Sequence, residues 1–380
     1  MACPVTVVAL FPGKEYTTMK KIDWFCERKW GLFHHYLPHS TEPSAKSGLK
    51  AYKSFSDRVN AFDVKNYAKT AHELNAGYVF FTIMQARRYM CAPNAAYNKI
   101  TGFKPGEACS ERDLIADLIE ELDKYDIPLF LYIPADGPFD DEEGSKSFGF
   151  CESKNEGDGI TTEFVEKWAS VLEEYALRYK DKVHGWWIDG ANDYFGFKES
   201  HLKIYHDAIK KGNPDALITF NNGIYPLDVD APEYQKFYGN VTNGIKKREI
   251  VENYARKGDP IAKEVFDKPP VYVYRYSQYE DYTAGEANAF EEYPTQRFVD
   301  GSQWHILSFL GVCESESDLW GRNGNWGGFG CEYSGQYMYD YVKKCNSLGG
   351  VVTIDAALYD DGHIDWGQYE ILKKLGELRK

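Results

Sequence analysis

Residues 183–190 are the part of the chain whose side chains most clearly suggest chemistry. They read Val-His-Gly-Trp-Trp-Ile-Asp-Gly, an apolar run that predicts a short buried strand ending in the acid Asp189. Gly190 follows directly and allows the backbone to turn sharply. In barrels of alternating strands and helices, catalytic groups lie at the carboxyl ends of the strands. Asp189 is therefore a candidate nucleophile, with a metal ligand and a plain polar cap on the strand as the other readings.

Further polar and aromatic side chains follow or end other predicted strands. His34 and His35 end a first apolar segment, and since neighbouring residues on a strand face opposite ways, one of the two should point inward. Aromatic rings with a polar edge suit the faces of sugars as well as protein cores. We expect substrate contacts from eight residues at strand ends or in loops: His34, His35, Gln85, Trp186, Trp187, Asn221, Arg275 and Trp326.

The segments that must position these residues alternate between strand and helix patterns. Eight apolar segments are strand candidates: residues 29–36, 78–83, 129–133, 183–189, 216–220, 271–276, 305–312 and 349–355. Helical stripes precede several of them, such as residues 63–75 behind the N-cap candidate Asp63. This alternation predicts a parallel sheet. Without a linker-like stretch, we expect one (β/α)₈ barrel over residues 1–380, with long loops and no separate C-terminal domain.

Composition narrows the classes of partner. The formal net charge of −14 argues against binding to nucleic acid and to anionic membrane surfaces. No apolar run is long enough to cross a bilayer. The acidic run of residues 136–143 reads as a solvated loop rather than a cation site. We expect no cofactor and no metal; a homo-oligomer is possible.

The eight cysteines are scattered, with no Cys-x-x-Cys pair, which argues against a structural zinc site and fits reduced thiols. The N-terminal apolar run has no basic segment before it, so we predict no signal peptide. A cytoplasmic protein is the expectation, with a periplasmic or secreted one if a signal peptide has been removed.

Five short motifs occur in a familiar order: Lys29-Trp-Gly-Leu-Phe-His-His35, Trp187-Ile-Asp-Gly190, Asp281-Tyr-Thr-Ala-Gly-Glu286, the Trp320 to Gly327 region, and Gly349-Gly-Val-Val-Thr-Ile-Asp355 followed by Asp361-Gly-His-Ile364. In this the chain resembles glycoside hydrolase family 29, the α-L-fucosidases and their relatives. The likeness spans nearly the whole chain. It implies a barrel, a sugar substrate and Asp189 as the nucleophile.

The chain departs from the family pattern in two places. Where the family usually carries Lys-His-His-Asp-Gly-Phe after its second strand, this chain reads Met84-Gln-Ala-Arg-Arg-Tyr89. Gln85 retains hydrogen-bonding capacity, and Arg87 or Arg88 is suited to a carboxylate or sulfate. Many relatives also continue into a β-sandwich that this sequence does not include. The hydrolase frame is therefore expected to be retained, whereas specificity for fucose is in question.

The resemblance implies retaining hydrolysis by two carboxyl groups. Asp189 would form the glycosyl-enzyme intermediate, and Glu286, which matches a motif, would be the acid/base. Three neighbouring glutamates stay open for that second role: Glu280, Glu291 and Glu292. Three other functions also stay open, namely a hydrolase of the same frame acting on another sugar, a carbohydrate-binding barrel that has lost catalysis, and a metal-dependent hydrolase built on Asp189 with His34 or His35.

Overall fold

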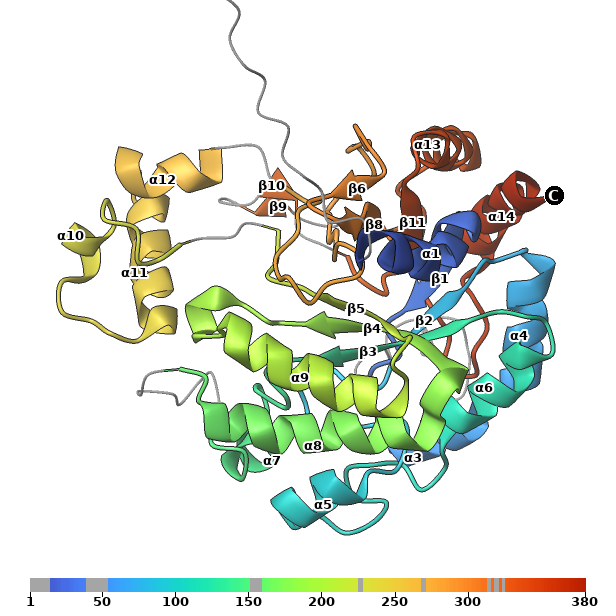
Figure 1. The fold of residues 1–380 in the computed structure, drawn as a ribbon, viewed down its shortest axis with the longest axis horizontal. Helices are drawn as coiled ribbons and strands as arrows, with labels where there is room; N and C mark the ends of the chain where they lie inside the picture. The colour runs from blue at the N-terminus through green and yellow to red at the C-terminus, as the bar shows by residue number, and fades with distance from the viewer. Residues whose placement is uncertain are drawn as a thin grey trace, which may run out of the picture.

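The computed structural model describes residues 14–38, 54–150, 159–224, 228–267, 271–312, 316–317, 321–322 and 325–380. Seven parallel strands form one curled sheet in the order β5-β4-β3-β2-β1-β11-β8 (Figure 1). They are β1 (Trp30–His34), β2 (Val79–Thr82), β3 (Leu129–Pro134), β4 (Val183–Asp189), β5 (Leu217–Phe220), β8 (His305–Phe309) and β11 (Val351–Asp355). Seven of the eight strand predictions thus match a strand of this sheet.

An irregular segment, residues 281–287, completes the barrel between β5 and β8. On one side the Asp281 N–H donates to the Ile218 carbonyl of β5 at 2.8 Å. On the other side the Leu307 N–H of β8 donates to the Gly285 carbonyl at 2.8 Å, and the Ala287 N–H donates back to Leu307 at 2.9 Å. The sheet is therefore closed by backbone hydrogen bonds, and the architecture is TIM-barrel-like, as predicted.

The remaining strand prediction, for residues 271–276, is wrong. In the structure these residues follow an irregular path outside the sheet. Their aromatic and β-branched residues suggested a strand, but the Tyr276 N–H is bound by the carboxylate of Glu280 at 2.8 Å instead of by a neighbouring strand. Residues 281–287 occupy the vacant place in the barrel.

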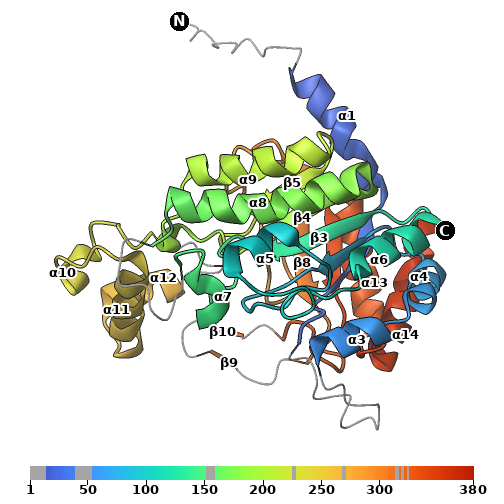
Figure 2. The same ribbon diagram turned by 90° about the horizontal axis from the view of Figure 1, so that it is seen from below.

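Helices cover the outer face of the sheet (Figures 1 and 2). Around the barrel these are α3 (Phe55–Ala61), α4 (Val64–Glu73), α5 (Ala95–Thr101), α6 (Leu114–Asp123), α7 (Glu142–Lys146), α8 (Thr162–Tyr179), α9 (Glu199–Gly212), α13 (Gly335–Ser347) and α14 (Trp366–Leu375). Helix α1 (Lys14–Glu27) lies instead at the amino ends of the strands, where Phe25 packs against the interior rings of Phe130 and Tyr282. Several begin at side-chain caps, such as Asp63, whose carboxylate accepts from the Asn66 N–H.

A second group of helices, α10 (Gln235–Tyr238), α11 (Gly244–Arg256) and α12 (Pro260–Asp267), forms a lobe beside the barrel (Figure 1). It has a small apolar cluster of its own that includes Val229, Tyr234 and Val251. There are also two short two-stranded sheets, β6 (Phe298–Val299) with β7 (Ser302–Gln303) and β9 (Glu316–Ser317) with β10 (Gly321–Arg322).

The strand pleat divides the core into two parts. Side chains such as Trp186 face the helices, whereas Trp187, Phe33, Phe130 and Tyr132 fill the barrel interior with aromatic rings. The Tyr132 and Trp187 rings stack with centroids 5.4 Å apart. This filled interior is the floor on which the site at the carboxyl ends of the strands rests.

Candidate active site

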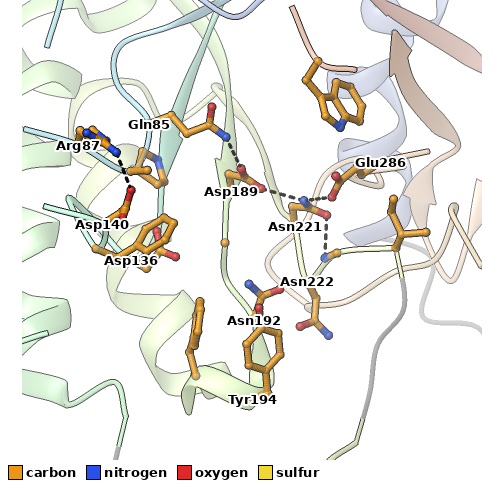
Figure 3. Close-up of a pocket in the computed structure, with 18 of the residues that line it drawn as sticks. Gln85, Arg87, Asp136, Asp140, Asp189, Asn192, Tyr194, Asn221, Asn222 and Glu286 are labelled. Carbon is orange, nitrogen blue, oxygen red and sulfur yellow. Dashed lines mark hydrogen bonds and ion pairs between the residues drawn. The ribbon is translucent and has the colours of Figure 1, made fainter. Parts of the chain in front are cut away.

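A cavity of about 650 Å³ opens at the carboxyl ends of the strands. Its walls come from segments far apart in the chain, including the loops after β2, β3, β4 and β5 (Figure 3), and helix α11 also contributes to them. Asp189 and Glu286 both line it. So do Gln85, Asn221 and Trp326. The structure therefore brings together the two predicted acids and three of the eight predicted contact residues.

Asp189 ends β4, and three donors surround its carboxylate. Oδ1 accepts from Asn221 Nδ2 at 2.8 Å. Oδ2 accepts from the hydroxyl of Tyr132 and, at 3.5 Å, from Gln85 Nε2. Gly190 follows with φ of +63°, and a Cβ there would lie 2.7 Å from Asp136. Glycine is required here for both conformation and space, so the turn that presents Asp189 depends on this residue.

Glu286 is carried by the segment that closes the barrel. Gly285 precedes it with φ of +61°, and a Cβ on Gly285 would lie 2.0 Å from the His305 carbonyl oxygen. Glu286 Oε2 accepts from the same Asn221 nitrogen at 2.5 Å (Figure 3). Asp189 Oδ1 and Glu286 Oε2 are thus no more than about 5.3 Å apart, the sum of 2.8 Å and 2.5 Å. The two acids form a close pair.

The two carboxyl groups differ in their electrostatic setting. Burial and, second, the negative charge of Asp189 raise the pKa of Glu286 to about 7. The hydrogen bond from Asn221 and the nearby His35 act in the opposite direction. A buried carboxyl group next to a second carboxylate is the arrangement in which one acid stays protonated near neutral pH while the other is ionised. This pair is suited to general acid–base work.

The other three glutamate candidates lie elsewhere. Glu280 is buried, and its carboxylate accepts from the backbone N–H groups of Phe220, Tyr276 and Ser277 and from the Thr219 hydroxyl. It therefore ties the irregular segment 271–276 to β5. Glu291 is exposed and Glu292 is partly buried, and neither lines the cavity.

The adjacent histidines face opposite ways, as the strand pleat requires. His35 turns into the barrel, with its ring centroid 5.8 Å from that of Trp326 and its Nδ1 3.2 Å from Asp355 Oδ1. His34 turns outward and is fully buried, with Nδ1 2.6 Å from the Ala356 carbonyl oxygen. The prediction that His34 contacts the substrate is therefore wrong, because its side chain packs between β1 and α4.

The two tryptophans and Arg275 also need correction. Trp186 faces the helix layer and Trp187 lies inside the barrel, so neither lines the cavity. Trp187 instead supports Tyr132 from behind. The Arg275 guanidinium donates to the backbone carbonyls of Ser277, Gln278 and Asp300, which joins two loops away from the cavity. Arg275 does not lie at the cavity as predicted, because residues 271–276 are not a barrel strand.

Several lining or contacting residues were missed from the sequence. Tyr132 sits on β3 and touches Asp189, and Asp136 lines the cavity with only 1% exposure, in contrast to the solvated loop predicted for it. Arg248 reaches the cavity from α11. Asp136 could have been found, because it follows a predicted strand just as Asp189 ends one. No pattern in the sequence indicated Arg248.

Two further features of the described residues concern metal binding and membrane spans. Within the described ranges, no group of three or more His, Cys, Asp or Glu side chains is arranged to hold a metal ion. Among the helices that are described, none is both long and apolar enough to span a membrane.

Comparison with known proteins finds similarity in structure alone. No protein-family model matches the chain, and no curated protein matches its sequence. Solved structures do match. An α-L-fucosidase of family 29 from Bacteroides thetaiotaomicron, trapped as a covalent intermediate, aligns with a TM-score of 0.54 at 16% identity, over 94% of this chain and 74% of that one.

Two further structures show the same fold. An endo-fucoidan hydrolase of glycoside hydrolase family 107 aligns with a TM-score of 0.60 at 13% identity, over 95% of this chain and 93% of that one. The α-L-fucosidase AlfC, as a variant in complex with Fucα(1,6)GlcNAc, aligns with a TM-score of 0.57 at 13% identity, over 94% and 98%. The resemblance to family 29 is thus confirmed at the level of the fold.

Proposed function

We propose that this protein is a glycoside hydrolase of the fucose-acting kind that works with retention of configuration. The observation that carries the proposal is the pair Asp189 and Glu286, with nearest oxygens no more than about 5.3 Å apart, the sum of 2.8 Å and 2.5 Å. Retaining glycosidases hold their two carboxyl groups about 5–5.5 Å apart, whereas inverting ones need about 6.5–9.5 Å to admit a water. The spacing supports attack by an enzyme carboxylate.

The proposed reaction has two balanced steps. The Asp189 carboxylate attacks the anomeric carbon, the bond to the leaving oxygen breaks, and protonated Glu286 gives its proton to that oxygen. Glu286, now ionised, then removes a proton from a water whose oxygen attacks the same carbon. The ester to Asp189 breaks, which restores the carboxylate of Asp189 and the acid form of Glu286. The sum is one glycoside plus one water, giving a sugar and an alcohol.

Fucose as the sugar is supported by the fold and by the motifs. The similar structures include α-L-fucosidases and endo-fucoidan hydrolases. The loop after β2 differs from the family pattern, however, and Gln85 and Arg87 from this loop line the cavity. We therefore propose an α-L-fucoside first, with another glycoside handled by the same two acids as the alternative.

The experiment is hydrolysis of a panel of aryl glycosides by the wild type, Asp189→Gly and Glu286→Ala, each with and without azide. We expect the wild type to cleave the fucoside and both variants to lose activity. Azide should restore turnover in both variants, with glycosyl azides of opposite anomeric configuration as the products.

Other outcomes of the same panel would change the proposal. Activity on a different glycoside, lost in Asp189→Gly and restored by azide, would keep the mechanism and replace the sugar. Failure of the wild type on the panel and on fucose-containing oligosaccharides, together with retained sugar binding by Asp189→Asn, would favour a binding barrel without catalysis.

A further inference from the structure

Asn221 is fixed to the end of β4 by its own backbone. It is the first residue after β5, and its N–H donates to the Ile188 carbonyl at 2.8 Å. Its carbonyl accepts from the Ala191 N–H at 2.9 Å. These two bonds flank Asp189 and Gly190 in the sequence of β4 and its turn. The main chain of Asn221 is thus locked in register with the backbone that presents Asp189.

The Asn221 amide is oriented by a third bond. Its Oδ1 accepts from the Gly223 N–H at 3.0 Å, which directs Nδ2 toward the two acids. That nitrogen carries two hydrogens, and its two acceptors are Asp189 Oδ1 at 2.8 Å and Glu286 Oε2 at 2.5 Å (Figure 3). Asn221 is 4% exposed. Both hydrogens of one buried nitrogen are therefore used to join the two carboxyl groups.

We propose that Asn221 is a positioning residue that sets the spacing of Asp189 and Glu286 by donating to both carboxyl groups from one nitrogen. This goes beyond the substrate contact expected for Asn221 from the sequence, and it rests on the proposed function of the acid pair. A hydrogen-bond donor stabilises the charged form of a carboxyl group. Loss of the donor would therefore raise the pKa of Glu286 and release the spacing of the pair.

The other groups around Glu286 do not supply the same contact. The charged or titratable side chains that act on it come from β4, from the residue after β1, from β3 and from the segment after α12: Asp189, His35, Tyr132 and Tyr274. Asp189 raises the pKa of Glu286, and His35 lowers it through its charge. Tyr132 donates to Asp189, and Tyr274 donates to the Gly223 carbonyl. Asn221 alone, among the described bonds, joins the pair.

Three variants test this assignment. Asn221→Asp keeps the shape and the backbone bonds but replaces the donor nitrogen by an acceptor. Asn221→Ser leaves one hydroxyl, which can donate to only one acid at a time. Asn222→Ser is the matched control, because Asn222 is the next residue and also lines the cavity, but its side chain accepts from the Asp193 N–H and touches neither acid.

We expect kcat of Asn221→Ser to fall about 10- to 100-fold, the loss of one hydrogen bond to a charged group, with KM little changed. We expect kcat to fall further in Asn221→Asp, although aspartate has the same shape as asparagine. The alkaline limb of the pH profile of kcat/KM, which reports Glu286, should move to higher pH in the Asn221 variants, by about one unit for Asn221→Ser. Asn222→Ser should leave this limb in place, whatever its effect on KM.

The assignment and the proposed function fail in different ways. Carboxyl ¹³C NMR of labelled protein follows Glu286 directly and requires no turnover, so the titration is decisive even if no substrate is cleaved. An unmoved Glu286 titration and an unmoved alkaline limb in folded Asn221→Asp and Asn221→Ser would overturn the positioning role. So would a rise in KM with kcat unchanged, which would return Asn221 to substrate binding. Loss of azide rescue in Asp189→Gly would instead overturn the proposed function.

Discussion

The hydroxyl of Tyr132 donates to Oδ2 of Asp189, the carboxylate oxygen that Asn221 does not contact. The tyrosine ring stacks on Trp187 inside the barrel, with an angle of 16° between the ring planes. Burial raises the pKa of Tyr132 well above its ordinary value, so the hydroxyl remains a donor across the working pH range. The barrel core thus fixes one oxygen of Asp189, and the chain after β5 fixes the other.

Tyr132→Phe should lower kcat by about 10- to 100-fold, because a hydrogen bond to a charged group is worth about 1.5–3 kcal/mol. The ring stack on Trp187 remains, so the fold should be kept. Steady-state kinetics and thermal unfolding provide the test. Tyr282→Phe is the control: its hydroxyl donates to the Trp186 carbonyl within the barrel and makes no bond to Asp189. Equal losses of kcat in both variants would contradict the assignment.

The pH profile should reflect the raised pKa of Glu286. The acid form is needed to protonate the leaving group, and it is present below the pKa of about 7 and lost above it. We expect kcat/KM to decline above about pH 7. Glu286→Gln should abolish that limb for an activated aryl leaving group, which needs little protonation. A limb that persists unchanged in Glu286→Gln would assign it to another residue.

Glu280 should matter for stability rather than for chemistry. Its carboxylate accepts three backbone N–H bonds, so Glu280→Gln would direct an amide N–H₂ at groups that are themselves donors. Leaving buried donors unpaired costs about 1–3 kcal/mol. Urea unfolding should show a loss of about that size, while the alkaline limb of the remaining activity stays with Glu286. A moved limb without loss of stability would argue that Glu280 is the catalytic acid.

His34 should stabilise the folded protein only while its own imidazole is neutral. Burial lowers its pKa to about 4, below the ordinary value of 6.5. Between these values the unfolded chain binds the proton and the native protein does not, so the stabilisation is lost as the pH falls. His34→Gln keeps a neutral side chain. The advantage of the wild type over His34→Gln should therefore shrink by about 2–3 kcal/mol from pH 7 to pH 4 in urea unfolding. A constant advantage would show that His34 titrates normally.

Much of the barrel could be predicted because its strands are short apolar runs between capped helices. The exception, residues 271–276, has the composition of a strand, yet its backbone is bound by the Glu280 carboxylate. The segment that replaces it contains Gly285 in a left-handed conformation and small residues with weak strand preference. Local pattern fails here because side-chain and backbone bonds from distant segments decide the path.

The site was predictable to a different degree for different residues. Asp189 followed from its position at a strand end, whereas Glu286 depended on motif resemblance. The pleat predicts that one residue of each adjacent pair faces inward, but which one depends on how the strand packs, so His34 and Trp186 could not be separated from their neighbours. Arg248 comes from a separate helical lobe. Its approach to the cavity is a matter of tertiary packing.

The position of β1 between β2 and β11 has a consequence for synthesis on the ribosome. Once β1 to β5 have emerged, one edge of β1 exposes unpaired N–H and C=O groups until residues 351–355 are made. During that interval Asp189 and Asn221 are already present at the ends of neighbouring strands, whereas Glu286 is made later and Asp355, the partner of His35, last. An open strand edge is a template for pairing with another chain, and the acid pair is complete only once residue 286 has been made.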